Sequence, residues 1–249
     1  MHTMRLDLYI VESGLASSRT DAKRFIIAGS VAVNGKEITK PAFEVDPSVH
    51  TVTVDSSSKK FVSRGGIKLE YALDSFEIDV ADRLALDVGA SSGGFTDCLL
   101  KRGASHVIAV DSGSGQLAPT LICDERVTSI ESFNARYMKP SDFTYTPDIA
   151  VMDVSFISAK LIIPAVYSCL AESSDFVCLV KPQFEVGKSG LGKNGIVKDE
   201  SLRRQALLSV IDFGKAVGFT CMSSVESPIH GGDGNIEYLV HFRKDSHQL

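Results

Sequence analysis

The strongest chemical signal in this chain is a glycine-rich turn over residues 87–96, which reads Asp-Val-Gly-Ala-Ser-Ser-Gly-Gly-Phe-Thr. An apolar run precedes the turn, and a helix-like segment follows it. Because glycine has no Cβ, such a turn lets the backbone approach a ligand and aims free helix N–H groups at it. A second apolar run ends at Asp111, whose carboxylate could accept hydrogen bonds from a ribose. This order of elements is typical of a site for a nucleotide-derived cofactor.

Other kinds of glycine turn fit residues 87–96 less well. The dinucleotide fingerprint G-x-G-x-x-G is absent. Residues 89–93 match the G-x-S-x-G elbow of hydrolases, but His230 and His241 are the only plausible bases, and no oxyanion loop precedes the turn. A turn that binds nothing is the last alternative. An acid followed by small residues and glycines favours S-adenosylmethionine. The residues expected to bind it are Asp87, Gly89, Ala90, Ser91, Gly93 and Asp111.

Four charged residues fall where strands of a sheet would begin or end. Asp153 and Lys181 each follow an apolar run, so in a parallel sheet both would lie at the carboxyl edge, where such folds place their sites. Glu237 begins the last apolar run and reaches the same edge if that strand is antiparallel. Lys68 lies early in the helix before the cofactor strand. Each could be an ordinary surface charge, but a shared edge indicates a catalytic group.

The elements that must position these residues alternate apolar strands with helical stretches. This pattern predicts an α/β domain with a Rossmann-like, mainly parallel sheet. The predicted strands are 84–89, 106–111, 127–131, 149–153, 176–181, 220–225 and 236–242. The predicted helices are 66–75, 95–103, 158–171 and 200–216.

Residues 1–58 form a separate small domain in this interpretation, and residues 59–249 form the larger one. Ser18 and Asp21 have the spacing of a capping box, which would open a helix that Gly29 ends in the left-handed conformation. Asn34-Gly35 after an apolar run is a type I′ hairpin signal. A polar stretch at residues 56–60 has the composition of a linker.

Composition and charge exclude several classes of protein. No apolar run approaches the ~20 residues that span a bilayer, and the first residues lack the apolar core of a signal peptide. The five cysteines are scattered and show no metal-ligand spacing. We therefore expect a cytoplasmic protein without a metal or a membrane partner. The net charge is −5, yet residues 1–68 carry ten Lys and Arg against seven Asp and Glu, which is compatible with phosphate contact.

The small domain resembles the alpha-L RNA-binding domain of the ribosomal protein S-four type. The matching stretches are Met4-Arg-Leu-Asp7, Ser18-Arg19, Ile27-Ala-Gly29 and Val33-Asn-Gly35. Arg19 and Lys23 lie one helical turn apart on one face, although a solvated helix face is the alternative for the charges alone. A further basic loop at residues 187–194 nearly spells a P-loop but has Asn where Ser or Thr must stand. The residues expected to contact RNA are Arg5, Arg19, Lys23, Arg24, Lys36, Arg64, Lys188 and Lys193.

The larger domain resembles RNA 2′-O-methyltransferases of the RrmJ/FtsJ class. The resemblance rests on Val62-Ser-Arg-Gly-Gly-Ile-Lys-Leu69, Asp153, Lys181-Pro-Gln-Phe and Glu237-Tyr. With the N-terminal module, nearly the whole chain resembles the TlyA (haemolysin A) family of ribosomal RNA methyltransferases. This implies a catalytic tetrad of Lys68, Asp153, Lys181 and Glu237, with Glu131 and Asp153 as further cofactor contacts. Ser112 and Pro119 depart from the family pattern beside the expected cofactor ribose.

The resemblance implies that a ribose 2′-hydroxyl of ribosomal RNA, in a cytidine, attacks the methyl group of S-adenosylmethionine in line. Lys181 would lower the pKa of the hydroxyl or accept its proton, and Asp153 would hold Lys181 or the hydroxyl in place. Lys68 and Glu237 would complete the charge network. Ribosomal RNA or ribosomal subunits are the expected partners. The alternatives are a non-catalytic RNA-binding or ribosome-assembly factor and a membrane-lytic protein, for which no spanning or strongly basic amphipathic helix is present.

Overall fold

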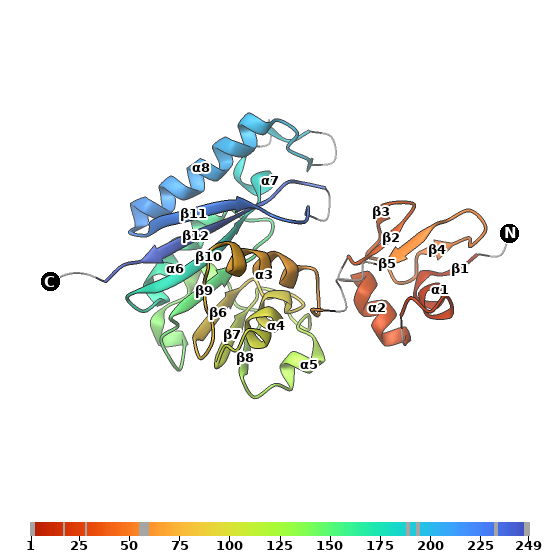
Figure 1. Cartoon of the computed structure of the whole chain (residues 1–249), viewed down its shortest axis with the longest axis horizontal. Helices are drawn as coiled ribbons and strands as arrows, with labels where there is room; N and C mark the ends of the chain where they lie inside the picture. Colours follow the sequence, from red (N-terminus) through yellow and green to blue (C-terminus); the bar gives the residue numbers. More distant parts are fainter. Residues whose placement is uncertain are drawn as a thin grey trace. The chain divides into compact units, whose positions relative to one another are not determined.

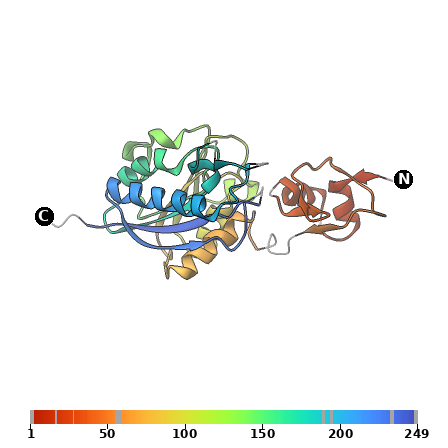
Figure 2. The same cartoon turned by 90° about the horizontal axis from the view of Figure 1, so that it is seen from above.

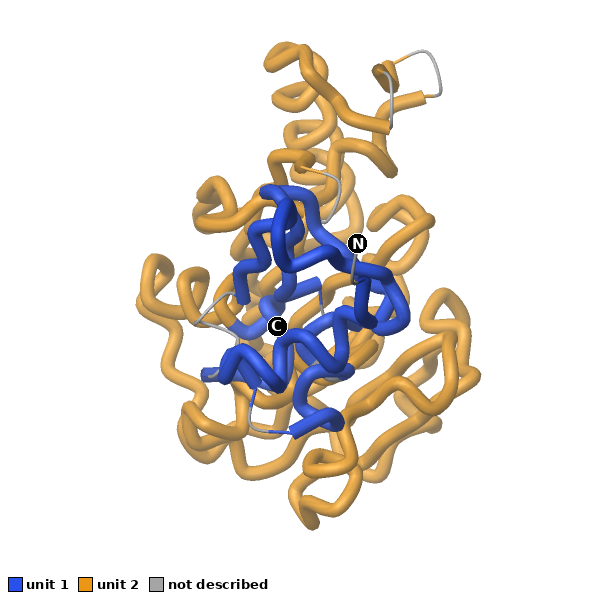
Figure 3. The backbone as a smooth tube through the Cα atoms, turned by 90° about the vertical axis from the view of Figure 1, so that its right-hand side faces the viewer, with its two compact units in different colours: residues 1–66 blue, residues 67–249 orange. Residues whose placement is uncertain are grey.

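The computed structural model describes residues 3–16, 18–27, 29–54, 60–187, 190–192, 195–231 and 234–246. The chain divides into two compact units, residues 1–66 and residues 67–249 (Figure 3). The small unit extends to residue 66, so the division lies beyond the boundary expected after residue 58. Arg64 forms an ion pair with Glu37, with 2.6 Å between Nη2 and Oε2.

The small unit combines two helices with short strands around its own core (Figure 1). Its elements are β1 (Met4–Arg5), α1 (Leu6–Glu12), α2 (Arg19–Ile27), β2 (Val31–Val33), β3 (Lys36–Glu37), β4 (Glu44–Val45) and β5 (Val52–Val54). β1 pairs with β4, and the other three strands form a sheet in the order β3-β2-β5. Leu6, Ile10, Ile26 and Val31 are fully buried between the helices and this sheet.

The capping and turn residues predicted for the small unit adopt the expected backbone conformations. The Asp21 backbone N–H donates to Ser18 Oγ at 3.1 Å, so Ser18 caps α2 as predicted. Gly29 follows the helix with a φ of +71°. Asn34 and Gly35 have φ values of +51° and +76°, as a type I′ turn requires. The predicted hairpin is confirmed, with Val33 opposite Lys36.

The larger unit is a seven-stranded sheet in the order β11-β12-β10-β9-β6-β7-β8 (Figure 1). Its strands are β6 (Leu84–Val88), β7 (His106–Val110), β8 (Val127–Ile130), β9 (Ile149–Met152), β10 (Ser174–Val180), β11 (Thr220–Glu226) and β12 (Tyr238–Lys244). The pairs that join β10, β9, β6, β7 and β8 are parallel, whereas β12 is antiparallel to β10 and to β11. The predicted Rossmann-like sheet is therefore confirmed.

Helices cover both faces of this sheet, and α3 and α6 lie on opposite sides (Figure 2). The helices of the larger unit are α3 (Gly65–Ser75), α4 (Gly94–Lys101), α5 (Pro119–Ile122), α6 (Ile163–Cys169), α7 (Pro182–Glu185) and α8 (Glu200–Val217). Short 3-10 turns lie at Ala135–Tyr137, Pro140–Asp142 and Ala159–Leu161. The helix predicted over 158–171 is divided into such a turn and α6, since Pro164 has no N–H to continue the hydrogen-bond ladder.

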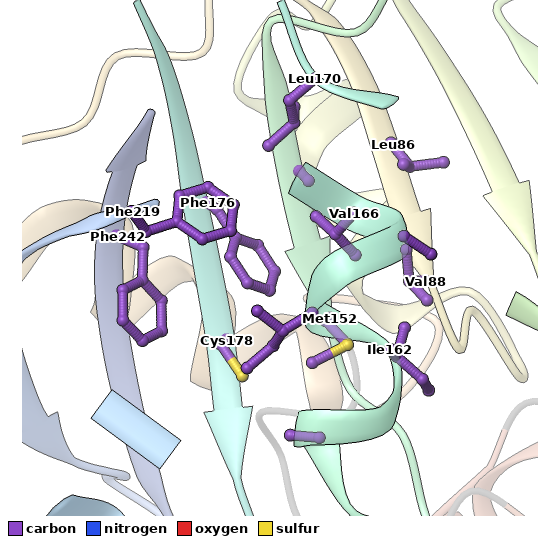
Figure 4. Packing of buried hydrophobic residues seen from close by; sticks show 14 of the residues in the cluster. Leu86, Val88, Met152, Ile162, Val166, Leu170, Phe176, Cys178, Phe219 and Phe242 are labelled. Carbon is purple, nitrogen blue, oxygen red and sulfur yellow. The ribbon is translucent and has the colours of Figure 1, made fainter. Parts of the chain in front are cut away.

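A buried aromatic cluster joins the last strands to β10 (Figure 4). Phe176 and Phe242 face each other across β10 and β12, with ring centroids 5.8 Å apart, and Phe219 packs against both. Gly214 of α8 lies so close to Phe242 that a Cβ there would meet the ring at 2.6 Å. This packing fixes the register of the two strands whose ends carry Lys181 and Glu237.

Strand register places the ends of five segments at one edge. Val88 lies opposite both Val110 and Met152, so the residues that follow β6, β7 and β9 leave the sheet together. Val180 lies opposite Tyr238, so the end of β10 meets the start of β12. The conditional prediction that the last strand is antiparallel is confirmed.

Candidate functional site

The larger of two neighbouring cavities lies where the glycine turn leaves the sheet. It measures about 460 Å³ and is lined by Gly89 and Ser91 of the turn, by Asp111 after β7 and by Asp153 after β9. Apolar side chains such as Phe133 complete its wall. A cavity with an apolar wall and a few convergent polar groups is what a small organic ligand requires.

Asp111 accepts hydrogen bonds from two loops beside this cavity. Its Oδ2 accepts from the Ser91 backbone N–H at 2.7 Å, and its Oδ1 accepts from the Gly113 N–H at 2.7 Å. A carboxylate oxygen can accept more than one hydrogen bond, so both oxygens keep capacity for ligand hydroxyls. Glu131 follows the neighbouring strand β8; it accepts from the Gly115 N–H at 2.8 Å and so supports the loop rather than lining the cavity.

The two predicted glycines of the turn have different neighbours. Gly89 has a φ of +85°, and a Cβ there would lie 2.4 Å from the backbone oxygen of Asp153. Gly93 has a φ of +91° and is the residue before α4, where a Cβ would meet Leu121 at 2.2 Å. Among the described residues that line the larger cavity, Gly89 is present and Gly93 is not. Both glycines are therefore required by protein packing, and of the two, Gly89 lines the cavity.

Asp87 lies beneath the turn and is fully buried. Its Oδ2 accepts from Thr96 Oγ1 at 2.6 Å, while its Oδ1 has no hydrogen-bond partner in the described part of the chain. Burial raises the pKa of this carboxyl to about 7, and the nearby carboxylates of Asp153 and Asp111 add to the effect. An uncompensated acid at this position fits a ligand that brings positive charge, as S-adenosylmethionine does. Ala90 is likewise buried and lies outside the cavity wall.

The second cavity adjoins the first and measures about 290 Å³. Lys181 and Glu237 line it, and Ser155 and Phe156 line both cavities. The two spaces therefore meet at the loop that follows β9. A ligand in one cavity and a second ligand in the other would come together beside these two residues.

The structure gathers the four predicted catalytic residues into two ion pairs. Lys181 Nζ lies 2.6 Å from Asp153 Oδ1, and Lys68 Nζ lies 2.5 Å from Glu237 Oε2. The Lys68 and Glu237 side chains are only 10% and 2% exposed, so their charges compensate each other in a nearly dry environment. Each pair contributes one residue, Lys181 or Glu237, to the smaller cavity.

The sequence of the chain is similar to those of known methyltransferases. The chain matches the FtsJ-like methyltransferase family over residues 61–244 and the S4 domain over residues 4–50. It is 44% identical to the 16S/23S rRNA (cytidine-2′-O)-methyltransferase TlyA of Mycobacterium tuberculosis, over 96% of this chain and 89% of that protein. The chain belongs to the TlyA family of FtsJ-like methyltransferases.

Two further relatives extend the likeness to the whole fold of this TlyA-family chain. YqxC of Bacillus subtilis is 48% identical over 95% of this chain and 84% of its own length. A solved hemolysin-type structure from Streptococcus thermophilus matches with a TM-score of 0.78 at 43% identity, covering 99% of this chain and 90% of that one. Both units of this family member are thus shared with its relatives.

Two residues of the site, Ser155 and Phe156, were not predicted, although both lie within three positions of Asp153. Ser155 Oγ accepts a hydrogen bond from Lys181 Nζ at 2.7 Å. Phe156 is 92% exposed, has a φ of +64°, and packs against Phe184 with ring centroids 5.3 Å apart. An exposed aromatic residue in the left-handed region is an unusual combination that the sequence does not reveal. Of the two departures from the family pattern, Ser112 lines the larger cavity and Pro119 begins α5.

Two of the predicted RNA-binding residues of the S4-type unit, Arg5 and Arg19, are held by one carboxylate. Asp7 is buried and holds Arg5 Nε at 2.9 Å and Arg19 Nε at 3.1 Å. Hydrogen bonds from Arg5 and then Arg19 lower the pKa of Asp7 against the effect of burial. The two arginines remain 41% and 51% exposed, and Lys23 follows Arg19 by one helical turn.

Two other predicted RNA contacts are described in the small unit, Arg64 and Lys36. Arg64 is held by Glu37, and Lys36 is exposed in the hairpin. Lys188, Lys193 and the side chain of Arg24 lie outside the described part of the chain.

No cluster of metal-binding side chains occurs among the residues that the structure describes. Within the same ranges, no helix has the length and apolar character that crossing a membrane demands.

Proposed function

We propose that this protein transfers a methyl group from S-adenosylmethionine to a ribose 2′-hydroxyl of ribosomal RNA, with a cytidine as the target. The observation that carries the proposal is the Lys181–Asp153 ion pair at the junction of two cavities. A methyl donor and a hydroxyl acceptor need such adjoining spaces with a proton acceptor between them. The activity that its TlyA relative from Mycobacterium tuberculosis is named for supports the choice of a cytidine ribose.

The larger cavity would hold the methyl donor. Asp111 would accept hydrogen bonds from the ribose hydroxyls, and Gly89 would let the chain pass close to the ligand. Asp87 would compensate positive charge, and Phe133 would pack against the flat adenine. When bound, S-adenosylmethionine supplies a methyl group activated by a positively charged sulfur.

The smaller cavity would hold the target ribose. Lys181 would accept the proton of the 2′-hydroxyl as that oxygen attacks the methyl group that the donor supplies. Asp153 then stabilises the lysine as an ammonium ion. The pair of Lys68 and Glu237 keeps the wall of the cavity polar without adding net charge.

The small unit would anchor the RNA substrate. Arg5 and Arg19, held on Asp7, offer further guanidinium N–H groups to phosphate, and Lys23 extends the group along α2. Arg24, Lys36, Arg64, Lys188 and Lys193 stay predicted contacts. With ribosomal subunits as substrates, we expect the protein to act in the cytoplasm.

The decisive experiment incubates the protein with S-adenosylmethionine and with small or large ribosomal subunits that lack the modification. Mass spectrometry of nuclease digests should then find a new 2′-O-methylcytidine. The two subunits are separate arms, so the preferred substrate follows from the same data. Methyl transfer to a base, or RNA binding without any methyl transfer, would contradict the proposal, and the second result would favour a non-catalytic assembly factor. Calorimetric titration with S-adenosylmethionine tests the cofactor directly.

A further inference from the structure

The Lys181 amine has two oxygen neighbours that differ in kind. Asp153 Oδ1 lies 2.6 Å away, at ion-pair distance, but this oxygen makes no hydrogen bond of acceptable angle with any described residue. Ser155 Oγ lies 2.7 Å from the same nitrogen and satisfies both the distance and the angles of a hydrogen bond. Ser155 is therefore the directed contact of Lys181, and Asp153 is its charge partner.

Direction matters because Lys181 must present a lone pair. A lysine side chain ends four carbons from the backbone and acts largely as a point charge, so attraction to a carboxylate alone leaves its orientation loosely defined. A neutral amine has two N–H groups and one lone pair. The hydrogen bond to Ser155 fixes the direction of one N–H, so the lone pair of the amine can be directed into the cavity that Lys181 lines.

We propose that Ser155 is a positioning residue for methyl transfer, which aims the amine of Lys181 at the substrate hydroxyl. This inference rests on the proposed function and adds a residue to its machinery. Ser155 is suited to the task by its place, since it lines both the cavity for the donor and the cavity for the acceptor.

The loop that carries Ser155 is held at both ends. At its start, the Asp153 N–H donates to the Val88 carbonyl at 3.0 Å. At its end, Glu185 accepts from Ser158 Oγ at 2.6 Å and from the Ala159 N–H at 2.7 Å. Glu185 ends α7, the short helix that begins directly after Lys181. The lysine and the loop that orients it are thus joined through one helical turn.

The test compares Ser155→Ala and Ser155→Thr in single-turnover methylation with saturating ribosomal substrate and S-adenosylmethionine. We expect Ser155→Ala to slow the reaction roughly 10- to 100-fold, the range for a misdirected catalytic group. Its affinities for both substrates should stay within about two-fold of the parent, since the change acts on the chemical step. Ser155→Thr keeps the oxygen and should recover most of the rate. Ser224→Ala removes an exposed hydroxyl from β11 and is the matched control.

A double variant asks whether Ser155 acts through Lys181. Ser155→Ala combined with Lys181→Ala should be no slower than Lys181→Ala alone, because positioning has no value without the amine. A Ser155→Ala variant at the parental rate, or a Ser155→Thr variant as slow as the alanine variant, would overturn the proposal. A loss that appears only as weaker binding of S-adenosylmethionine would make Ser155 a cofactor contact instead. Failure of the proposed function is visible separately, as absence of methylation by the parent protein.

Discussion

Replacing Gly89 by alanine tests how the glycine turn supports the reaction. A Cβ at Gly89 would lie 2.4 Å from the backbone oxygen of Asp153, and the φ of +85° disfavours any residue with a Cβ. The left-handed backbone costs about 1–2 kcal/mol, and overpacking against a neighbour costs about 1–3 kcal/mol more. We therefore expect Gly89→Ala to lower the free energy of unfolding by about 2–5 kcal/mol.

Gly103 offers a matched control for the backbone term. Its φ is +92°, but a Cβ there would meet Ala81 only at 3.5 Å, an ordinary contact distance. Gly103→Ala should therefore cost about 1–2 kcal/mol. For a domain of this size, 1 kcal/mol changes Tm by roughly 2–4 °C, so the two variants should differ by roughly 2–12 °C in calorimetry.

The same substitution should impair catalysis through Asp153. To relieve the contact, the backbone of Asp153 must move, and its carboxylate is the charge partner of Lys181. A displacement near 1 Å can cost about 100-fold in rate, so Gly89→Ala should slow methyl transfer far more than Gly103→Ala does. The assay is methylation of ribosomal subunits at a temperature where both variants are folded. Equal Tm values and equal rates for the two variants would refute the reasoning.

Three further changes have definite expected outcomes. Lys181→Ala should abolish single-turnover methyl transfer, while calorimetry should find an S-adenosylmethionine affinity within a few-fold of the parent. Lys181→Arg should not restore the rate, because a guanidinium cannot give up its proton near neutral pH. A parental rate in either variant would exclude Lys181 as the proton acceptor. Asp7→Asn should weaken ribosomal RNA binding several-fold in fluorescence anisotropy at fixed salt, because the carboxylate that holds both arginines is lost. The change also makes the unit more positive, so tighter binding would mean that net charge, and not arginine placement, governs the contact. Burial raises the pKa of Asp175, but hydrogen bonds from His241 and Arg83 outweigh it and lower the value to about 2. Since the folded-state pKa lies below the unfolded value of about 4, this stabilisation is complete above pH 4 and is lost as pH falls towards 2. Acid unfolding of Asp175→Asn, followed by circular dichroism, should therefore be less steep between pH 4 and 2 than that of the parent, and an unchanged profile would contradict the role of this ion pair.

Local patterns in the sequence were sufficient for the elements and for the edge at which the chemistry lies. Apolar runs marked the strands, and the turn at residues 87–96 marked the larger cavity, because a backbone that must adopt positive φ selects glycine within a few residues of chain. Asp153 and Lys181 could be placed at one edge because parallel strands end together. The S4-type unit was predicted in the same way from its cap, its glycine and its hairpin turn.

Contacts between distant segments were decided only in three dimensions. That Lys68 pairs with Glu237 depends on α3 lying beside the start of β12, and these residues are 169 positions apart in the chain. The contacts of Gly93 with Leu121 and of Arg64 with Glu37 also join distant segments, and the local sequence gives no sign of them. The sequence does not distinguish Ser155 from the other serines, because its contact with Lys181 forms only where the end of β10 lies beside the loop after β9. Backbone conformation follows from neighbouring residues, whereas the partner of a charged or polar side chain follows from strand order and packing, which are properties of the whole fold.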